Sequence, residues 1–428
     1  MLDLMRVLVL FGALGIVFLG ILGGGMGLVI SPSQEVDRLV IVTFSGSLFL
    51  LTTGLGLALA WQAWGAMQKR PSSIFQPKRV WFLALFFLVS VAMGHLILSL
   101  HLLPVATFPL FHAGATILPP VLIVALVARG LDRTTTWRDV TLQIASGAFL
   151  ATTLAFTLEA IAILAMLTTT FLGLAIQPGG QELMEKMVTY LNTPTWLQGP
   201  NTLVPLLMSP AILAATFAFI AGIIPIIEEA VKTVGVGLMS YRHPTLSQAF
   251  LWGLAGGAGF ALVEGLLNTT AGLDGWALVV LLRLGATLLH CLTGALMGLA
   301  WYYALTWRRW GYCLGLYATS VGIHALWNTL SVGLALLSLG TLDTTMVDSR
   351  WMWAGPIIII ALMLLVILAL TMMLGLFGLT RYVRQHSAVP VARPASLTAT
   401  PAKLGPPDDM AASGQLPSTS AQQNPDSE

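Results

Sequence analysis

Two adjacent glutamates and a lysine interrupt a long apolar segment in the sequence "PIIEEAVKTVG", from Pro225 to Gly235. An ionisable side chain at membrane depth costs roughly 2.5–3.5 kcal/mol on insertion scales, so each one needs a partner or a task. Glu228 and Lys232 are four residues apart and share a helix face, whereas Glu229 points about 100° away from Glu228. One glutamate can therefore face a cavity while the other pairs with Lys232 or with a neighbouring helix.

Polar side chains recur in the three apolar segments that follow. They are, in chain order, Glu264, Asn268, Arg283, His290, His324 and Asn328. On the helical rise of 1.5 Å per residue, His290 lies about 20 Å from the outer end of its segment and His324 about 20 Å from the inner end of its own. Both imidazoles therefore fall near the middle of a span. We expect these groups and the glutamate pair to converge on one cavity.

Carboxylates and imidazoles in a pocket of low dielectric constant are suited to activating water, because a base and an acid can coexist there. Asn328 or an imidazole could stabilise a developing oxyanion. Alternatively, Glu264, His290 and His324 could hold a zinc ion, with a glutamate of the pair as general base. The residue types and spacings are compatible with both chemistries.

The elements that must position these groups are transmembrane helices. Hydrophobic residues make up 57% of the 428 residues and charged residues only 9%, and the mean hydropathy is +0.86; this composition excludes an ordinary soluble domain. Apolar segments of roughly 20 residues, the length that crosses a bilayer, recur along the chain. The alternating segments of about 10 residues that a β-barrel needs are not found. The sequence therefore predicts an all-α, polytopic transmembrane helical bundle of about ten spans.

The predicted spans have bounds that can be read from the apolar segments. They are approximately residues 5–30, 39–64, 80–102, 108–128, 140–176, 203–239, 247–269, 277–304, 311–338 and 352–380. The fifth and sixth are longer than one crossing requires, so we expect each to tilt, to kink at a proline or to extend beyond the bilayer. In the seventh, Gly253 and Gly257 would permit close helix approach. Basic residues gather in alternate loops, which predicts that both termini are cytoplasmic.

The chain divides into four predicted regions. These are an N-terminal transmembrane region of about five spans (1–200), a core of four helices with buried polar groups (203–340), the last span (352–384) and a C-terminal tail (385–428). The tail is rich in Pro, Ala, Ser and Thr, a composition that cannot bury enough apolar area to offset the entropy of ordering. We expect it to be a disordered cytoplasmic segment.

Four short motifs on the sixth to ninth spans resemble those of the PrsW family of intramembrane proteases, which is related to the CAAX prenyl endopeptidases. The motifs are "EEAVK" (Glu228 to Lys232), "FALVE" (Phe260 to Glu264), "HCLTG" (His290 to Gly294) and "HALWN" (His324 to Asn328). The resemblance covers about residues 209–335. It implies catalytic roles for Glu228, Glu229, Lys232, Glu264, His290, His324 and Asn328.

The implied activity is that of an intramembrane endopeptidase, in which a water molecule activated by glutamate and histidine, with or without a metal such as zinc, hydrolyses a peptide bond. Its substrates would be membrane proteins, and for a subset of the family an anti-sigma-factor-like regulator. The implied location is a bacterial plasma membrane. The scattered basic residues predict no nucleic-acid partner.

The competing hypotheses are a multi-pass transporter or channel that uses the buried Glu and His residues as a proton or ion path, and an inactive scaffold.

Two further polar positions lie in the N-terminal region. Glu159 stands alone in the fifth span and is either a substrate or proton contact or a hydrogen-bonded structural group. His112, near the outer end of the fourth span, is expected to be a satisfied or interfacial imidazole in preference to a functional one.

Overall fold

The protein is mostly helical in the part of the chain that the computed structural model describes, residues 2–29, 35–176, 210–342 and 354–387, with short pieces between 181 and 189. Ten helices in this part are long and apolar enough to cross a membrane. The prediction of an all-α polytopic bundle is confirmed. From residue 388 onward the predicted tail lies outside the described residues, as do residues 203–209 at the start of the sixth predicted span.

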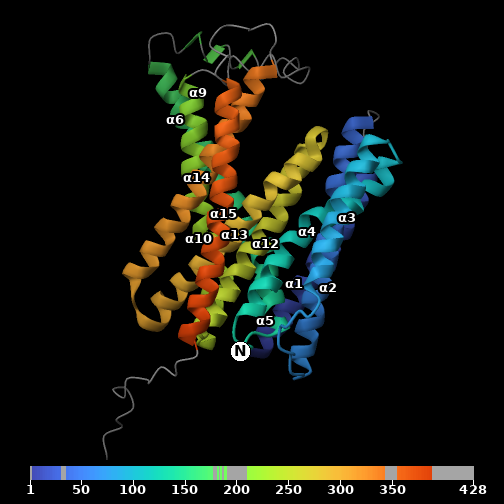
Figure 1. Cartoon of the computed structure of the whole chain (residues 1–428), viewed down its shortest axis with the longest axis vertical. Helices are drawn as coiled ribbons and strands as arrows, with labels where there is room; N and C mark the ends of the chain where they lie inside the picture. Colours follow the sequence, from blue (N-terminus) through green and yellow to red (C-terminus); the bar gives the residue numbers. More distant parts are fainter. Residues whose placement is uncertain are drawn as a thin grey trace, which may run out of the picture. The chain divides into compact units, whose positions relative to one another are not determined.

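Figure 1 shows the bundle, with labels on most of its helices. The described elements follow one another along the chain in the order given next. They are α1 (Leu2–Val29), α2 (Glu35–Met67), α3 (Val80–Ser99), α4 (Pro104–Gly130), α5 (Trp137–Ala145), η1 (Ser146–Ala151), α6 (Thr152–Ile176), α9 (Pro210–Phe217), η4 (Ala218–Ile223), α10 (Ile224–Val231), α11 (Val234–Met239), η5 (Ser240–Arg242), α12 (Leu246–Ala271), η6 (Leu273–Gly275), α13 (Trp276–Trp307), α14 (Trp310–Leu342) and α15 (Ala354–Ser387). η1 and η4 are π-helical, whereas η5 and η6 are short 3₁₀ helices.

The two long spans that were expected to be irregular each contain a π-helical turn. In the fifth span η1 separates α5 from α6, and in the sixth η4 separates α9 from α10, whose first turn contains Pro225. The sixth span is interrupted again after Lys232, before α11 begins at Val234. π-helical turns are rare in proteins as a whole, and those that occur are often found at functional sites. The EEAVK motif therefore occupies a short helix with an irregularity on either side.

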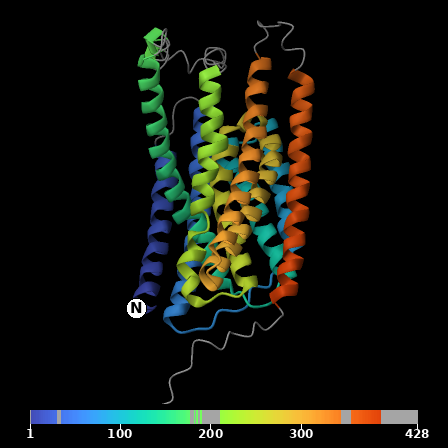
Figure 2. The same ribbon diagram turned by 90° about the vertical axis from the view of Figure 1, so that its left-hand side faces the viewer.

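Helix α12 is the central helix of the bundle and packs against α13, α4 and α5 (Figures 1 and 2). In its most apolar part 83% of the residues are buried, against 17% for α14. A Cβ added at Gly253 would lie 2.6 Å from the Cα of Gly298, and one added at Gly257 would lie 3.2 Å from the Cα of Gly294. The expected close approach at Gly253 and Gly257 is confirmed, and it brings α12 against the histidine-bearing helix α13.

Polar contacts tie together the elements at one end of the bundle. Thr136 and Asp139 form a capping box that starts α5, and Thr245 and Gln248 form another that starts α12. The Asp139 carboxylate also accepts a hydrogen bond of 2.6 Å from Arg242 in η5. The contact between Asp139 and Arg242 fixes the start of α5 relative to the end of the span that carries the glutamate pair.

His112 joins three helices away from the motif residues. Its side chain is fully buried, with Nδ1 2.8 Å from the Ser47 hydroxyl in α2 and Nε2 2.9 Å from the Thr269 hydroxyl in α12. Both ring nitrogens therefore have a hydroxyl partner, as expected for a structural imidazole.

Candidate active site

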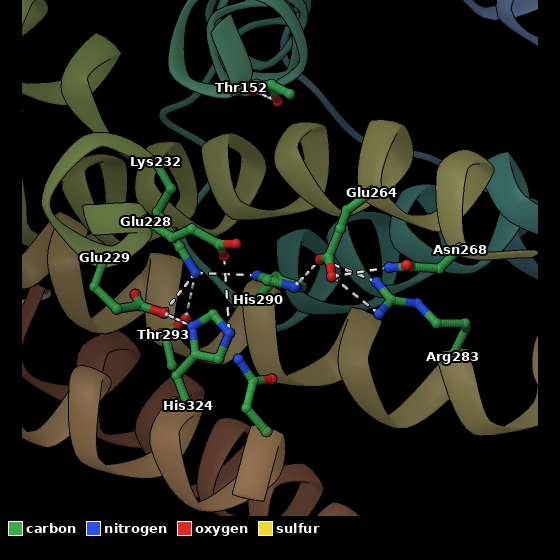
Figure 3. A network of polar contacts seen from close by, with 12 residues as sticks. Thr152, Glu228, Glu229, Lys232, Glu264, Asn268, Arg283, His290, Thr293 and His324 are labelled. Carbon is green, nitrogen blue, oxygen red and sulfur yellow. Dashed lines mark hydrogen bonds and ion pairs between the residues drawn. The ribbon is translucent and has the colours of Figure 1, made fainter. Parts of the chain in front are cut away.

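Helices of four consecutive spans place the motif residues around one buried region (Figure 3). Glu228 and Glu229 lie on α10 with Lys232 at its end, Glu264 and Asn268 on α12, Arg283, His290 and Thr293 on α13, and His324 and Asn328 on α14. Glu229 and Lys232 are fully buried, and Glu228, His290 and His324 are at most 6% exposed. The structure brings the glutamate pair, the lysine and both histidines together, as the spacing predicted.

Lys232 is the cation at the centre of this region. Its ammonium group donates a hydrogen bond of 2.6 Å to Glu229 Oε1 and one of 3.2 Å to the Thr293 hydroxyl. It also lies 3.0 Å from Nδ1 of His290. Because a buried charge is costly unless it is paired and hydrogen-bonded, these three contacts explain how a lysine is tolerated at this depth.

His324 lies between the two adjacent glutamates. Its Nδ1 is 2.8 Å from Glu229 Oε1, and its Nε2 is 3.8 Å from Glu228 Oε2. The first distance is that of a hydrogen bond, whereas the second is too long for one. Glu229 therefore holds the ring while Glu228 faces its other nitrogen across a gap, so that the two glutamates occupy different environments.

Glu264 forms a second carboxylate centre beside His290. Arg283 clamps it with both terminal nitrogens, each 3.0 Å from a different carboxylate oxygen, and Asn268 donates to Oε1 over 3.1 Å. Glu264 Oε2 in turn contacts Nε2 of His290. A bidentate arginine fixes the orientation of a carboxylate as well as its charge, so Arg283 sets the position from which Glu264 holds the imidazole.

Each histidine thus has one nitrogen on a carboxylate and the other turned toward the interior of the site. This is the arrangement of metal-binding histidines, in which an outer carboxylate fixes the tautomer and orientation of the ring. Glu228, His290 and His324 offer ligand atoms that all lie within 4.8 Å of one another. Two imidazoles and a carboxylate form a donor set that binds zinc in hydrolases.

The composition of this group differs from the expected zinc ligands in one residue. Glu264 was the expected carboxylate ligand, but Glu228 is the carboxylate that lies with His290 and His324. Glu264 is held on the outer side of His290 by Arg283. The motif spacing could not separate these positions, because both glutamates lie at similar depth.

Each glutamate of the adjacent pair has one carboxylate oxygen that is buried without a hydrogen bond. Glu228 Oε2 and Glu229 Oε2 have no hydrogen-bond partner within the described part of the chain. Buried polar atoms are normally satisfied, and exceptions call for an explanation such as a catalytic role, an ion or a water molecule. The free oxygen of Glu228 fits such a role, because it faces His324 Nε2.

Asn328 is placed at the edge of the site and not among the clustered groups. Its amide donates a hydrogen bond of 2.9 Å to the carbonyl oxygen of Ile220 in η4. The asparagine therefore satisfies a backbone acceptor at the π-helical turn that precedes the glutamate pair.

Thr293 and Arg283 contribute contacts that were not assigned to them from the sequence. Thr293 follows His290 by three residues and Arg283 precedes it by seven, so all three share one face of α13. That spacing was the available signal for both.

Glu159, on α6, has one buried carboxylate oxygen without a hydrogen-bond partner among the described residues, and α6 packs against α10.

Fold and site together define a polytopic membrane protein with a buried glutamate–histidine–lysine centre. The family model described as "PrsW family intramembrane metalloprotease" matches residues 135–371, more than half of the chain. The chain belongs to this family, which makes it a membrane-embedded protease. No match was found among curated proteins or among solved structures. Membership of a protease family favours hydrolysis over the transporter or channel alternative.

Proposed function

We propose that the protein hydrolyses peptide bonds of membrane-protein substrates at a metal-assisted site formed by Glu228, His290 and His324. The observation that carries this proposal is the unpaired Oε2 of Glu228, which is buried and lies 3.8 Å from His324 Nε2. Such a gap is suited to a shared third partner, either a divalent ion or the attacking water.

The roles of the surrounding residues follow from their contacts. Glu229 accepts the Nδ1 proton of His324, and Glu264, held by Arg283, occupies the corresponding position on His290. A divalent ion such as zinc would supply Lewis acidity, polarising the scissile carbonyl and acidifying a water molecule. In the reaction, water adds to the carbonyl carbon, the C–N bond breaks, and the water proton is transferred to the leaving amine.

A glutamate-dependent reaction without a metal is the alternative mechanism. It is favoured by Lys232, whose ammonium lies 3.0 Å from His290 Nδ1. The ammonium therefore occupies the place where an ion bound to that nitrogen would lie. In that case Glu228 would act as the general base, and Lys232 would supply positive charge near a developing oxyanion.

The cellular setting is proposed from the family and from the distribution of charges. We infer a bacterial plasma membrane with both termini in the cytoplasm, because the basic loops alternate with weakly charged ones. The substrates would be membrane proteins, with an anti-sigma-factor-like regulator as a candidate for the first test.

The test is cleavage of a membrane-tethered reporter by the full chain reconstituted in vesicles. Glu228→Gln and His324→Ala should insert and fold but lower turnover by about 10²–10⁴-fold, the usual contribution of an acid–base group. His95→Ala is a matched control, because His95 is an exposed residue of α3. Normal cleavage by Glu228→Gln would exclude the assigned role.

Metal analysis of the same preparations distinguishes the two mechanisms. A metal-assisted site predicts a bound divalent ion in the wild type, loss of that ion in Glu228→Gln, and inactivation by a chelator that is reversed by the metal. Full activity of metal-free protein would support the glutamate-dependent mechanism. Substrate-dependent uptake without cleavage, lost in the same variants, would instead identify a transporter.

A further inference from the structure

Glu159 is an acidic residue inside the fifth span that the proposed mechanism does not use. On the helical rise of 1.5 Å per residue, it lies about 33 Å from the end of this span at Trp137 and about 21 Å from the end at Gly173. With the span centred on a hydrocarbon core of about 30 Å, the carboxyl group falls inside that core. A carboxylate at this depth is costly unless a partner meets its charge.

The face of α6 that carries Glu159 is directed toward the catalytic helices. Ala155 precedes Glu159 by four residues and is fully buried in one apolar cluster with Phe260 of α12. The ring of Phe260 lies 5.4 Å from that of His290, so this cluster borders the site. The fifth and seventh spans begin at the same end of the bundle, and Phe260 precedes Glu264 by four residues. One helical turn beyond the cluster therefore brings Glu159 beside Glu264, which is within its electrostatic range.

The basic residues of the site are already occupied. Lys232 is paired with Glu229 at 2.6 Å, and both side chains are fully buried. Arg283 is held by the Glu264 carboxylate. No basic residue of the described part of the chain pairs with Glu159, and its Oε1 is buried there without a hydrogen-bond partner. The partner that this carboxylate requires is therefore a cation from outside these residues.

A basic side chain of the substrate meets this requirement better than a second metal ion. Among the described residues, the group that could hold a metal consists of Glu228, His290 and His324, and Glu159 is not part of it. A lysine or arginine supplies both a positive charge and hydrogen-bond donors. Such a residue is itself costly inside a membrane segment, so its pairing with Glu159 would relieve two unmatched charges at once.

We propose that Glu159 binds a lysine or arginine side chain of the substrate close to the cleaved bond. Glu159 then determines specificity, selecting membrane proteins that carry a basic residue in the segment that enters the site, and takes no part in the bond-breaking steps. The inference rests on the proposed function, because it names the class of substrate for the same hydrolytic site.

The experiment uses pairs of membrane-tethered reporters that differ only by Lys or Gln at one position, scanned over the residues on either side of the cleaved bond. At one or two positions the wild type should show a ratio of kcat/KM, Lys over Gln, of at least about tenfold, the lower end of couplings between close charge pairs. Glu159→Gln should bring this ratio to about one, and Glu159→Lys should reverse the preference toward a reporter with Glu at that position. A loss of folded protein lowers both rates and leaves the ratio unchanged, so the ratio separates recognition from stability.

Two further measurements complete the test. Glu185→Gln removes an exposed carboxylate and should retain the wild-type ratio; an equal change in this variant, or a wild-type ratio in Glu159→Gln, would overturn the proposal. Binding of the same reporters to Glu228→Gln, which keeps Glu159, measures recognition without turnover and should still favour Lys. Absence of that binding preference also overturns the proposal, whereas normal cleavage by Glu228→Gln with the preference intact would overturn only the proposed function.

Discussion

Two buried histidine clusters in this protein have opposite characters. Around His112, neutral hydroxyl groups of Ser47 and Thr269 satisfy both ring nitrogens. Around His290 and His324, the partners are carboxylates and an ammonium group, and carboxylate oxygens stay unpaired. A cluster that only joins helices can be neutral and satisfied, whereas a reactive site retains charge and unused acceptors.

The largest effect is expected at Glu228. Glu228→Gln keeps the shape of the side chain and removes its charge, so we expect turnover to fall by about 10²–10⁴-fold. Because Glu228 forms no ion pair shorter than 3.8 Å with the described residues, its loss should leave the thermal unfolding temperature nearly unchanged. Cleavage assays and thermal unfolding of the same preparation measure both quantities.

Glu229→Gln should behave differently from Glu228→Gln. The substitution leaves the buried ammonium of Lys232 without its carboxylate partner, and breaking a buried pair typically costs about 3–5 kcal/mol. We therefore expect lower stability together with lower activity. Equal unfolding temperatures and equal residual activities of the two variants would argue that the glutamates have equivalent roles.

An intermediate effect is expected at Arg283, which acts through Glu264 on His290. Loss of a group that orients a metal-binding histidine usually costs about 10–100-fold in metal affinity or activity. Arg283→Gln should lie in this range, and Arg283→Lys should recover part of the loss through its charge. Metal titration is the decisive measurement, because a purely structural role would lower stability without changing affinity.

The smallest effect on catalysis is expected in the neutral cluster. His112→Ala leaves hydroxyl groups of Ser47 and Thr269 without a partner, which should cost about 1–3 kcal/mol of unfolding free energy. Turnover per folded molecule should stay at the wild-type value. A fall in turnover comparable to that of Glu228→Gln would remove the distinction between the two clusters.

Much of the architecture could be predicted from the sequence because hydrocarbon imposes a simple rule. Spans need about 20 apolar residues, and the predicted seventh span, 247–269, corresponds to α12, Leu246–Ala271. Pairs within one helix were also predictable: Glu264 and Asn268 share a face by their four-residue spacing and are hydrogen-bonded. The spacing of residues along a single helix is enough to predict such pairs.

Contacts between helices were not predictable in the same way. The spacing allowed Lys232 to pair with either glutamate, and the structure pairs it with Glu229 because His290 and Thr293 of α13 lie beside the same ammonium. The choice of Glu228 over Glu264 beside His324 likewise depends on how α10, α12 and α14 are rotated relative to one another. Depth along a helix can be read from a sequence, but rotation about its axis depends on packing.

The glycine contacts between α12 and α13 constrain how a substrate can enter. The backbones of α12 and α13 touch at Gly253 and Gly298, with no side chains between them that could rearrange. We therefore expect these two helices to move little relative to each other. As a consequence, we expect a peptide that arrives from the lipid to enter by displacing a peripheral segment such as α14, in whose most apolar part only 17% of the residues are buried. Crosslinking α14 to α10 should block access to a folded, intact catalytic centre.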